Sequence, residues 1–301
     1  MRRALALVTL ASFLAVSLVV LQRPSSVGAS AAERRPSNAA DWTHVFRVIR
    51  TLKRKPPKVP VIYLLGGSAA RECTISDRAW AAEVRYIGGH RVRTFNLGSS
   101  GQTYAQSTTV VKLLPAVPSV VLIGVNLGRY MPQPVILATR GGEPLTPGAP
   151  AAARRARGYE QHQYHVAAIL TDAQKRAMVP WWLTHRYPIF KDNFAGNVAE
   201  LDQLIATCQA RGLHPVLVEM PLNQPIIGHA FDEPRKTYRD SCRALAKKYG
   251  IPKIDFLDKV PLVSGDFYDL YHLVEPGRVK WQLRLSKTVV SLLARYGMDK
   301  H

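Results

Sequence analysis

A serine, an aspartate and a histidine stand where they could form a site for acyl transfer. Ser68 follows a continuous apolar run at residues 59–65 and a pair of glycines. Asp269 and His272 are three residues apart in a late polar loop, a spacing that lets the carboxylate reach the imidazole. Such a carboxylate fixes the ring tautomer, and the other ring nitrogen can take the proton of a serine hydroxyl. The three residues together predict a serine nucleophile.

A local alternative exists for Ser68, because Gly66-Gly67-Ser68 also fits a tight turn with a serine that caps a helix. Acyl chemistry would further require donors for the oxyanion. The candidates are the backbone N–H groups of Ser68 and Gly101 and the side-chain amide of Asn126. Glycine suits this task because it lets the backbone approach a ligand closely.

A parallel sheet would have to position these residues. Apolar runs predict strands at residues 59–65, 91–96, 119–124, 215–219 and 253–256. Helical spacing predicts helices at residues 42–52, 69–88, 104–114, 195–211, 235–249 and 275–296. This alternation is typical of right-handed βαβ units, whose strand ends meet at one edge of the sheet. The sequence therefore predicts an α/β fold with a five-stranded parallel sheet, with Ser68, Gly101 and Asn126 at that edge.

The pattern is interrupted at about residues 130–197, after the third strand. Prolines and glycines recur there, three arginines lie within residues 154–157, and a helix is expected over 159–179. Trp181 and Trp182 belong to the most aromatic stretch of the chain. Insertions of this size are often lids or binding walls, so both tryptophans are candidates for substrate binding. The alternative is that they fill a small core of their own.

The order of these motifs resembles the SGNH (GDSL-type) hydrolases. Gly66-Gly67-Ser68 looks like the first block of that family, with Gly67 where Asp is usual, and residues 96–101 look like the second, with Gly101 in the glycine position. Residues 124–126 resemble the third block, with Leu127 in place of the usual Asp. Residues 269–272 resemble the last, with Leu273 in place of the usual Pro. The resemblance covers about residues 59–130 and 213–296.

That resemblance implies a three-layer α/β/α fold with a flavodoxin-like sheet. It also implies ester or thioester chemistry without a metal or cofactor, on lipids, glycans or acyl groups. Two other serine or phosphate patterns are missing. No Gly-x-Ser-x-Gly elbow surrounds Ser68, and the sequence has no Gly-x-x-x-x-Gly-Lys-Ser/Thr phosphate loop.

The N-terminus reads as a separate segment. Two arginines precede an uncharged apolar run at residues 4–21, and residues 29–31 offer a small-x-small cleavage site. Residues 1–31 are therefore expected to be a signal peptide or a membrane anchor, residues 32–58 a linker with a short helix, and residues 59–301 the working domain. The domain would be secreted or held at the outer face of the cytoplasmic membrane, with only the N-terminal segment in the bilayer.

The formal net charge of +20 predicts anionic partners. Export argues against nucleic acid and in favour of anionic polymers or lipid head groups of the cell envelope. A solvated basic surface without a specific partner is the alternative. Arg71, close to Ser68, could hold an anionic part of a substrate, or it could be an ordinary solvated helix arginine.

Three further groups carry weaker expectations. Cys208 and Cys242 could form a disulfide in an oxidising compartment, whereas Cys73 fits a buried small side chain. His162 and His165 could share a helix face, but no third metal ligand accompanies them. Asp266 could replace Asp269 as the partner of the histidine, from six residues away.

The expected activity is an exported serine esterase. Ser68 would attack an acyl ester of an envelope glycan or lipid, and His272 would shuttle the proton. The alternatives are an O-acyltransferase, in which a sugar hydroxyl replaces water, and a non-catalytic protein that binds or assembles anionic envelope polymers on the same fold.

Overall fold

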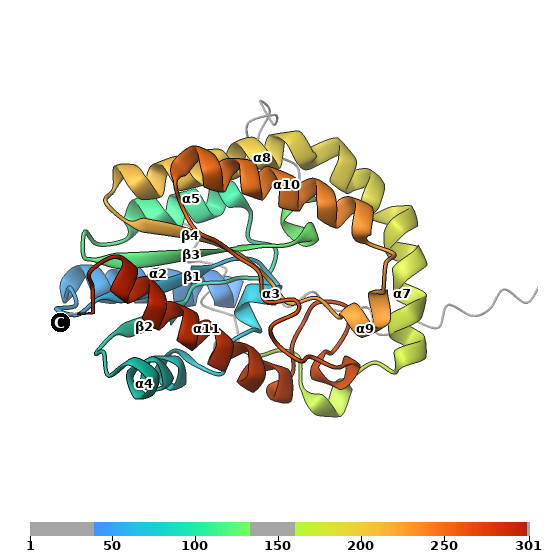
Figure 1. The fold of residues 1–301 in the computed structure, drawn as a ribbon, viewed down its shortest axis with the longest axis horizontal. Helices are drawn as coiled ribbons and strands as arrows, with labels where there is room; N and C mark the ends of the chain where they lie inside the picture. Colours follow the sequence, from blue (N-terminus) through green and yellow to red (C-terminus); the bar gives the residue numbers. More distant parts are fainter. Residues whose placement is uncertain (1–38, 133–159, 300–301) are drawn as a thin grey trace, which may run out of the picture. The chain divides into compact units, whose positions relative to one another are not determined.

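The computed structural model describes residues 39–132 and 160–299 (Figure 1). Five strands lie in these ranges: β1 Val61–Leu65, β2 Arg93–Asn96, β3 Ser119–Val125, β4 His214–Glu219 and β5 Lys253–Ile254. The α-helices are α2 Ala39–Arg54, α3 Ser68–Arg71, α4 Asp77–Gly88, α5 Tyr104–Leu113, α7 Asp172–His185, α8 Tyr187–Ala210, α9 Gln224–Ile227, α10 Asp232–Tyr249 and α11 Glu275–Arg295. Short 3-10 turns are η1 Leu127–Tyr130, η2 Val166–Ala168 and η3 Ser264–Asp266.

All five strands belong to one parallel sheet in the order β2-β1-β3-β4-β5. The chain therefore starts near the middle of the sheet, moves to one edge and then crosses back past β1. This is the flavodoxin-like order, and it confirms the predicted sheet. In such a sheet a crevice for ligands opens outside the carboxyl ends of the strands, where the direction of winding changes. Here that point lies between β1 and β3.

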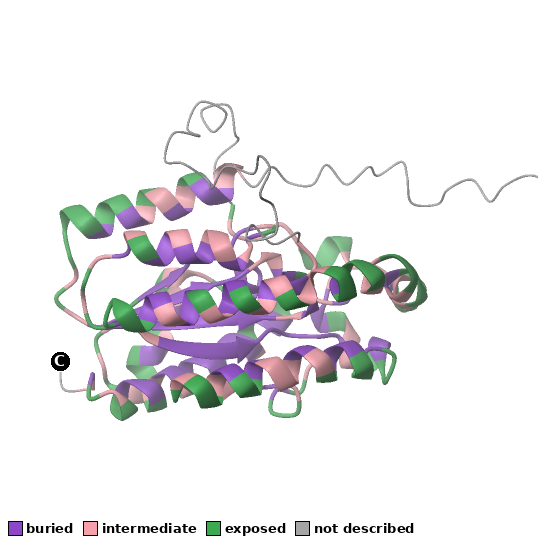
Figure 2. Cartoon of the chain, turned by 90° about the horizontal axis from the view of Figure 1, so that it is seen from above, coloured by how far each residue is buried: buried purple, intermediate pink, exposed green. Residues whose placement is uncertain are grey.

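Helices cover both faces of the sheet, which gives the predicted three layers (Figure 1). Alternate residues of β1 pack in opposite directions, as the two-residue repeat of a strand requires. Tyr63 joins a core with α2, α5, α8 and α10, whereas Ile62 and Leu64 join a second core with Trp80 of α4 and Trp281 of α11. Figure 2 shows buried strands between helices that are buried mainly on the side toward the sheet.

The prediction of one continuous helix at residues 69–88 is wrong. The structure has two helices there, α3 and α4, with a break at residues 72–76. Asn96 at the end of β2 explains the interruption. Its side-chain amide donates to the carbonyl of Ala70 at 2.8 Å and to the hydroxyl of Thr74 at 2.9 Å. Ser76 then caps α4, since its hydroxyl accepts the N–H of Ala79. The helical pattern was right, but a side chain from a neighbouring strand ends the first helix.

The insertion also differs from the prediction. Residues 160–171 contain only the short turn η2, so the helix expected at 159–179 begins instead at Asp172. A capping box of Thr171 and Gln174 sets this start, and the helix continues through Pro180. Helix α8 begins at Tyr187, eight residues before the predicted position. The arginines at residues 154–157 lie outside the described residues.

Helix α2, Ala39–Arg54, confirms the short helix predicted at residues 42–52 and begins three residues earlier. The expected signal or anchor at residues 1–31 lies outside the described residues. Of the helices in the described ranges, none combines the length and the apolarity that crossing a bilayer requires.

Candidate active site

Ser68 is the first residue of α3, directly after the turn that ends β1. All five residues of β1 are buried, so the sheet fixes the base of this turn. Gly66 must be glycine, because a Cβ there would lie 2.5 Å from the Cβ of Ala70. The N–H groups of Ala70 and Arg71 donate to the carbonyl of Gly67, which closes the first turn of the helix. The turn therefore presents Ser68 at the carboxyl edge of the sheet.

The structure brings Ser68, His272 and Asp269 into direct contact. His272 Nε2 lies 2.8 Å from Ser68 Oγ, and His272 Nδ1 lies 2.7 Å from Asp269 Oδ2. With a proton on Nδ1 donated to the carboxylate, Nε2 is free to accept the serine proton. The His272 and Asp269 side chains are 13% and 10% exposed, so both are largely shielded from solvent. The contacts have the form of a nucleophile, a base and a group that orients the base.

Asp269 is held as an anion. Its burial would raise the pKa, but the neighbouring His272 and the N–H groups of Tyr271 and His272 together keep the pKa below its ordinary value. Both N–H groups donate to Oδ1, at 2.8 and 2.9 Å, which leaves Oδ2 to face the imidazole. The carboxylate therefore fixes the loop with one oxygen and the histidine with the other.

Asn223 ties this loop to the sheet. It follows β4, is fully buried, and its side-chain amide donates to the carbonyl of Asp269 at 2.9 Å. Its backbone N–H donates to the carbonyl of Leu270 at 3.0 Å. The role of Asn223 could not be predicted from the sequence, because its partners lie more than 40 residues further along the chain.

The two other predicted oxyanion donors, Gly101 and Asn126, come from the loops on either side of β1. Gly101 lies in the loop after β2 with φ +69°, a conformation that favours glycine. Asn126 follows β3, and its Oδ1 accepts the N–H of Arg129 at 3.1 Å, so its Nδ2 is the donor end of the amide. Because β1 lies between β2 and β3, both residues follow strands next to β1 at the carboxyl edge of the sheet, as predicted. Their role as oxyanion donors stays a prediction.

Arg71 is not a substrate-binding residue, and this prediction is wrong. Its side chain is 1% exposed and forms ion pairs with Asp41 at 2.9 Å and Glu72 at 3.0 Å. It also donates to the side chain of Gln163 at 2.7 Å. The guanidinium thus binds side chains from α2, from the end of its own helix and from the insertion. It holds these three segments together.

The two tryptophans have different environments. Trp182 is buried and packs on Phe231 at a ring-centroid distance of 4.5 Å, so it belongs to the core and cannot bind substrate directly. Trp181 is 47% exposed and stacks on His185, with the Arg186 guanidinium over its ring. The core interpretation holds for Trp182, whereas substrate binding by Trp181 stays a prediction.

Tyr164 is a further residue near the site that the sequence did not indicate. Its ring stacks on the His272 imidazole with centroids 4.3 Å apart and an angle of 20° between the planes. It also contacts the ring of Tyr268 at 4.6 Å. The adjoining Gln163 N–H donates to Glu72 and the Tyr164 carbonyl accepts from Arg278, which anchors this stretch. The contact between Tyr164 and His272 could not be predicted from the sequence, because 108 residues separate the two rings.

The remaining candidates have other partners. His162 Nε2 contacts the carbonyl of Thr74 and His165 Nδ1 contacts Glu275, so the two histidines do not share a helix face. Asp266 pairs with Lys280, and the histidine partner is therefore Asp269.

The possible disulfide between Cys208 and Cys242 is a wrong prediction. Both cysteines are free and buried in the core above the sheet, and Cys242 Sγ lies 3.2 Å from the hydroxyl of Tyr130. Cys73 is also free and buried, as expected for a small core side chain.

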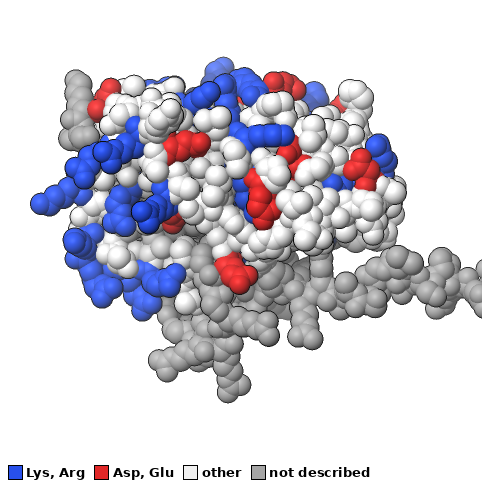
Figure 3. Space-filling model, turned by 90° about the horizontal axis from the view of Figure 1, so that it is seen from below, with Lys and Arg blue, Asp and Glu red and all other residues white. Residues whose placement is uncertain are grey.

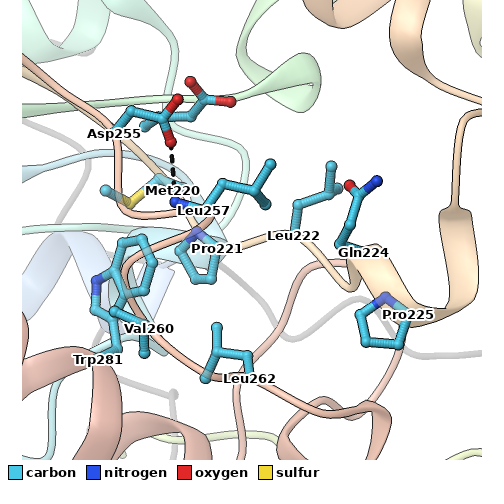
Figure 4. A pocket seen from close by; sticks show the side chains of 11 residues that line it. Met220, Pro221, Leu222, Gln224, Pro225, Asp255, Leu257, Val260, Leu262 and Trp281 are labelled. Atoms are coloured by element: carbon cyan, nitrogen blue, oxygen red, sulfur yellow. Dashed lines mark hydrogen bonds between the residues drawn. The ribbon is translucent and has the colours of Figure 1, made fainter.

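A pocket opens at the carboxyl ends of β4 and β5 (Figure 4). Met220, Leu262 and Trp281 contribute apolar surface, and Glu219 and Asp255 are its acidic lining residues. Asp255 also accepts the N–H of Leu257 at 3.0 Å. Ser68, Asp269 and His272 do not line it. The pocket is therefore separate from the three residues with the geometry for catalysis.

Comparison with known proteins gives structural likenesses only. No family model and no curated protein matches the chain. An acetylxylan esterase from Geobacillus stearothermophilus is 12% identical over 76% of this chain and 93% of its own, with a TM-score of 0.47. An alpha/beta hydrolase enzyme from the metagenome of Lake Arreo, Spain, is 12% identical over 80% and 96%, with a TM-score of 0.42. Because these TM-scores lie below 0.5, no functional conclusion is drawn from them.

Proposed function

We propose that this chain is a serine-dependent hydrolase of ester bonds. The observation that carries the proposal is the continuous contact from Ser68 Oγ to His272 Nε2 and from His272 Nδ1 to Asp269 Oδ2, at 2.8 and 2.7 Å. A serine hydroxyl is a weak nucleophile until a base takes its proton, and this arrangement supplies the base. The low pKa of Asp269 supports the same assignment, because an anionic carboxylate stabilises the imidazolium that forms.

The reaction would proceed through an acyl-serine. Ser68 Oγ bonds to the acyl carbon while its proton passes to His272 Nε2, and the carbonyl oxygen becomes an oxyanion. The C–O bond to the leaving alcohol then breaks, and that oxygen takes the proton from His272. Water attacks the acyl-serine in the second half, gives its proton to His272, and releases the acid as Ser68 recovers its hydrogen. The proposed oxyanion donors are the N–H groups of Ser68 and Gly101 and Nδ2 of Asn126.

We assign the chain to the SGNH hydrolases within this proposal. Support comes from the placement of the motifs: Ser68, Gly101 and Asn126 follow three adjacent parallel strands, and the late Asp-x-x-His returns to Ser68. The apolar N-terminal run supports export, and the charge of +20 supports a substrate on an anionic envelope surface. The proposed substrates are O-acyl esters of an envelope glycan or lipid. A sugar hydroxyl in place of water would make the same site an acyltransferase.

Turnover of p-nitrophenyl acetate by wild type, Ser68→Ala and Ser291→Ala tests the activity. Ser291 is an exposed serine on α11 and serves as the matched control. Loss of the nucleophile should lower kcat by at least about 10³-fold, while the control keeps the wild-type rate. A fluorophosphonate should label wild type on the peptide that contains Ser68.

Equal hydrolysis by wild type and Ser68→Ala would refute the assignment. Absence of both turnover and label, together with retention on an anionic polymer, would instead favour a non-catalytic binding protein. Addition of a sugar alcohol separates hydrolase from transferase, because only a transferase should form the sugar ester in preference to free acetate.

A further inference from the structure

A buried arginine that forms no ion pair with a carboxylate of the described residues lies close to the Ser68 turn. Arg129 belongs to η1, directly after β3, and is 2% exposed. Its Nη2 donates to Ser107 Oγ at 3.0 Å and its guanidinium stacks over the ring of Tyr104 at 4.2 Å. Nε and Nη1 have no hydrogen-bond partner in the described part of the chain. The other fully buried arginines, Arg71 and Arg278, both form ion pairs with carboxylates.

Such a group is costly to the folded state. Burial lowers the pKa of Arg129, an effect that Tyr104, Tyr130 and, least of the three, Glu200 oppose. The guanidinium nevertheless stays charged in proteins, so its desolvation is only partly offset by neutral partners. A buried charge that forms no ion pair calls for an explanation in function.

Arg129 faces the turn that carries the nucleophile. A Cβ on Gly66 would lie 3.7 Å from Arg129 Nη1, and one on Gly67 would lie 3.8 Å from Arg129 Cδ. The Arg129 side chain thus lies close to the backbone immediately before Ser68. On the other side, the Arg129 N–H donates to Asn126 Oδ1, which sets the orientation of the Asn126 amide.

A chain of hydrogen bonds extends this contact to the second loop. Ser107, which accepts from the guanidinium, donates to Gln102 Oε1 at 2.9 Å. The same oxygen of Gln102 accepts the N–H of Gly66 at 3.0 Å. Gln102 directly follows Gly101. Arg129 therefore links all three segments that supply the proposed oxyanion donors.

We propose that Arg129 is the electrostatic and positioning residue of the oxyanion site. This inference rests on the proposed esterase function. The negative charge that offsets Arg129 would arise only when the acyl oxygen becomes an oxyanion, so the cation favours the transition state over the neutral ester. The inference also explains Gly67. An aspartate at this position would place a permanent carboxylate against the Arg129 side chain and neutralise its field before the reaction starts.

The first test compares Arg129→Met, Arg129→Lys and the matched control Arg235→Met. Arg235 is another buried arginine, but it is paired with Glu219. On p-nitrophenyl acetate, Arg129→Met should lose about 10²-fold in kcat with KM changed less than about 3-fold. Inhibition by phenylboronic acid, which forms an anionic tetrahedral adduct with a serine, should weaken by a similar factor. Arg129→Lys should recover part of both.

Melting temperature separates this role from a structural one. Removal of an unpaired buried charge should leave the melting temperature of Arg129→Met equal to or above that of wild type. Arg235→Met instead loses an ion pair to the buried Glu219 and a hydrogen bond to Gln224, so it should melt lower. A drop for Arg129→Met as large as that for Arg235→Met would overturn the proposal. So would a wild-type kcat in Arg129→Met.

The second test leaves Arg129 in place. Gly67→Asp and Gly67→Asn differ by one charge, and the φ of −73° with ordinary van der Waals contact at the Cβ position permits either side chain. We expect Gly67→Asp to have a kcat about 10-fold or more below that of Gly67→Asn. Equal rates would contradict the proposal. A wild type that neither hydrolyses esters nor binds the boronate would refute the esterase function itself, whereas an active wild type with an equally active Arg129→Met refutes only the role of Arg129.

Discussion

The imidazole of His272 is constrained on three sides. Asp269 holds Nδ1, Ser68 lies at Nε2, and the ring of Tyr164 covers one face. Only the first two contacts could be predicted from the sequence, because the residue types and the three-residue spacing of Asp269 and His272 indicate them. The third comes from an insertion with no sequence motif. Residue chemistry therefore identified the proposed reacting groups, but not the ring that stacks on one of them.

Substitution of Tyr164 tests the importance of this stacking. Tyr164→Leu should lower kcat for p-nitrophenyl acetate by about 10-fold, because an unstacked His272 spends less time in the geometry that accepts the serine proton. Tyr164→Phe retains the ring and should stay within about 3-fold of wild type, since stacking of this kind depends on the aromatic face. The two variants should show similar melting temperatures. Equal kcat values for the Leu and Phe variants would exclude a positioning role for the ring.

Elements whose limits depend on local signals match the sequence closely. Helix α5 begins after Thr103, whose capping box with Gln106 is readable in the chain, and α11 begins with Glu275 and Pro276 as expected for a helix start. The division between α3 and α4 was not readable, because its cause is the amide of Asn96 on another strand. Long-range side-chain bonds of this kind carry no local pattern.

The first residue of α4 makes stability depend on pH. Burial raises the pKa of Asp77 to about 6, and this effect is partly offset by the N–H bond from Asn96 and by Arg93. The folded-state pKa lies above the unfolded value near 3.8, so the native state favours the protonated acid. Stability from this group is therefore complete below about pH 4 and is lost as pH rises through about 6.

Asp77→Asn should abolish this loss, because the amide oxygen can still accept the Asn96 N–H. Two pKa units correspond to about 3 kcal/mol, which solvent around the partly exposed carboxyl reduces to about 1–2 kcal/mol of added stability at pH 7. Urea unfolding from pH 4 to 7.5 measures the difference. Asp258→Asn, at an exposed aspartate, serves as the matched control. If the difference in unfolding free energy between Asp77→Asn and wild type were the same at every pH, Asp77 would not titrate in this range.

At the scale of the molecule, the topology was predictable and the buried charges were not. Strand order follows from right-handed crossovers and short connections, which leave few arrangements for five such strands. The location of Arg71 depends instead on Asp41 and Gln163, which lie 30 and 92 residues away in the chain. A local pattern of polar residues cannot distinguish such a buried arginine from a solvated one.

Basic side chains gather at one end of the face seen in Figure 3. Exposed arginines on the elements beneath the sheet include Arg85 of α4, Arg91 before β2 and Arg295 of α11. A triple change of these three to Glu should lower the salt concentration that elutes the protein from a heparin column, because each lost cation reduces counterion release. Activity on the small neutral ester p-nitrophenyl acetate should be unchanged.

A second triple variant controls for total charge. Lys236, Arg243 and Lys247 are exposed on α10, on the opposite side of the sheet, and their change to Glu alters net charge equally. If a basic patch beneath the sheet binds the anion, the α10 variant should elute later than the first. Identical elution of the two variants would assign the retention to net charge alone.

The bond between Ser68 and His272 joins residues 204 positions apart. During synthesis the nucleophile leaves the ribosome long before its base is translated, and the helix that follows His272 must still dock on the second core. An incomplete chain would therefore carry an inert serine. A fluorophosphonate would then label Ser68 only after the whole domain has folded. The rate at which labelling appears during refolding would therefore measure the rate of the last tertiary folding step.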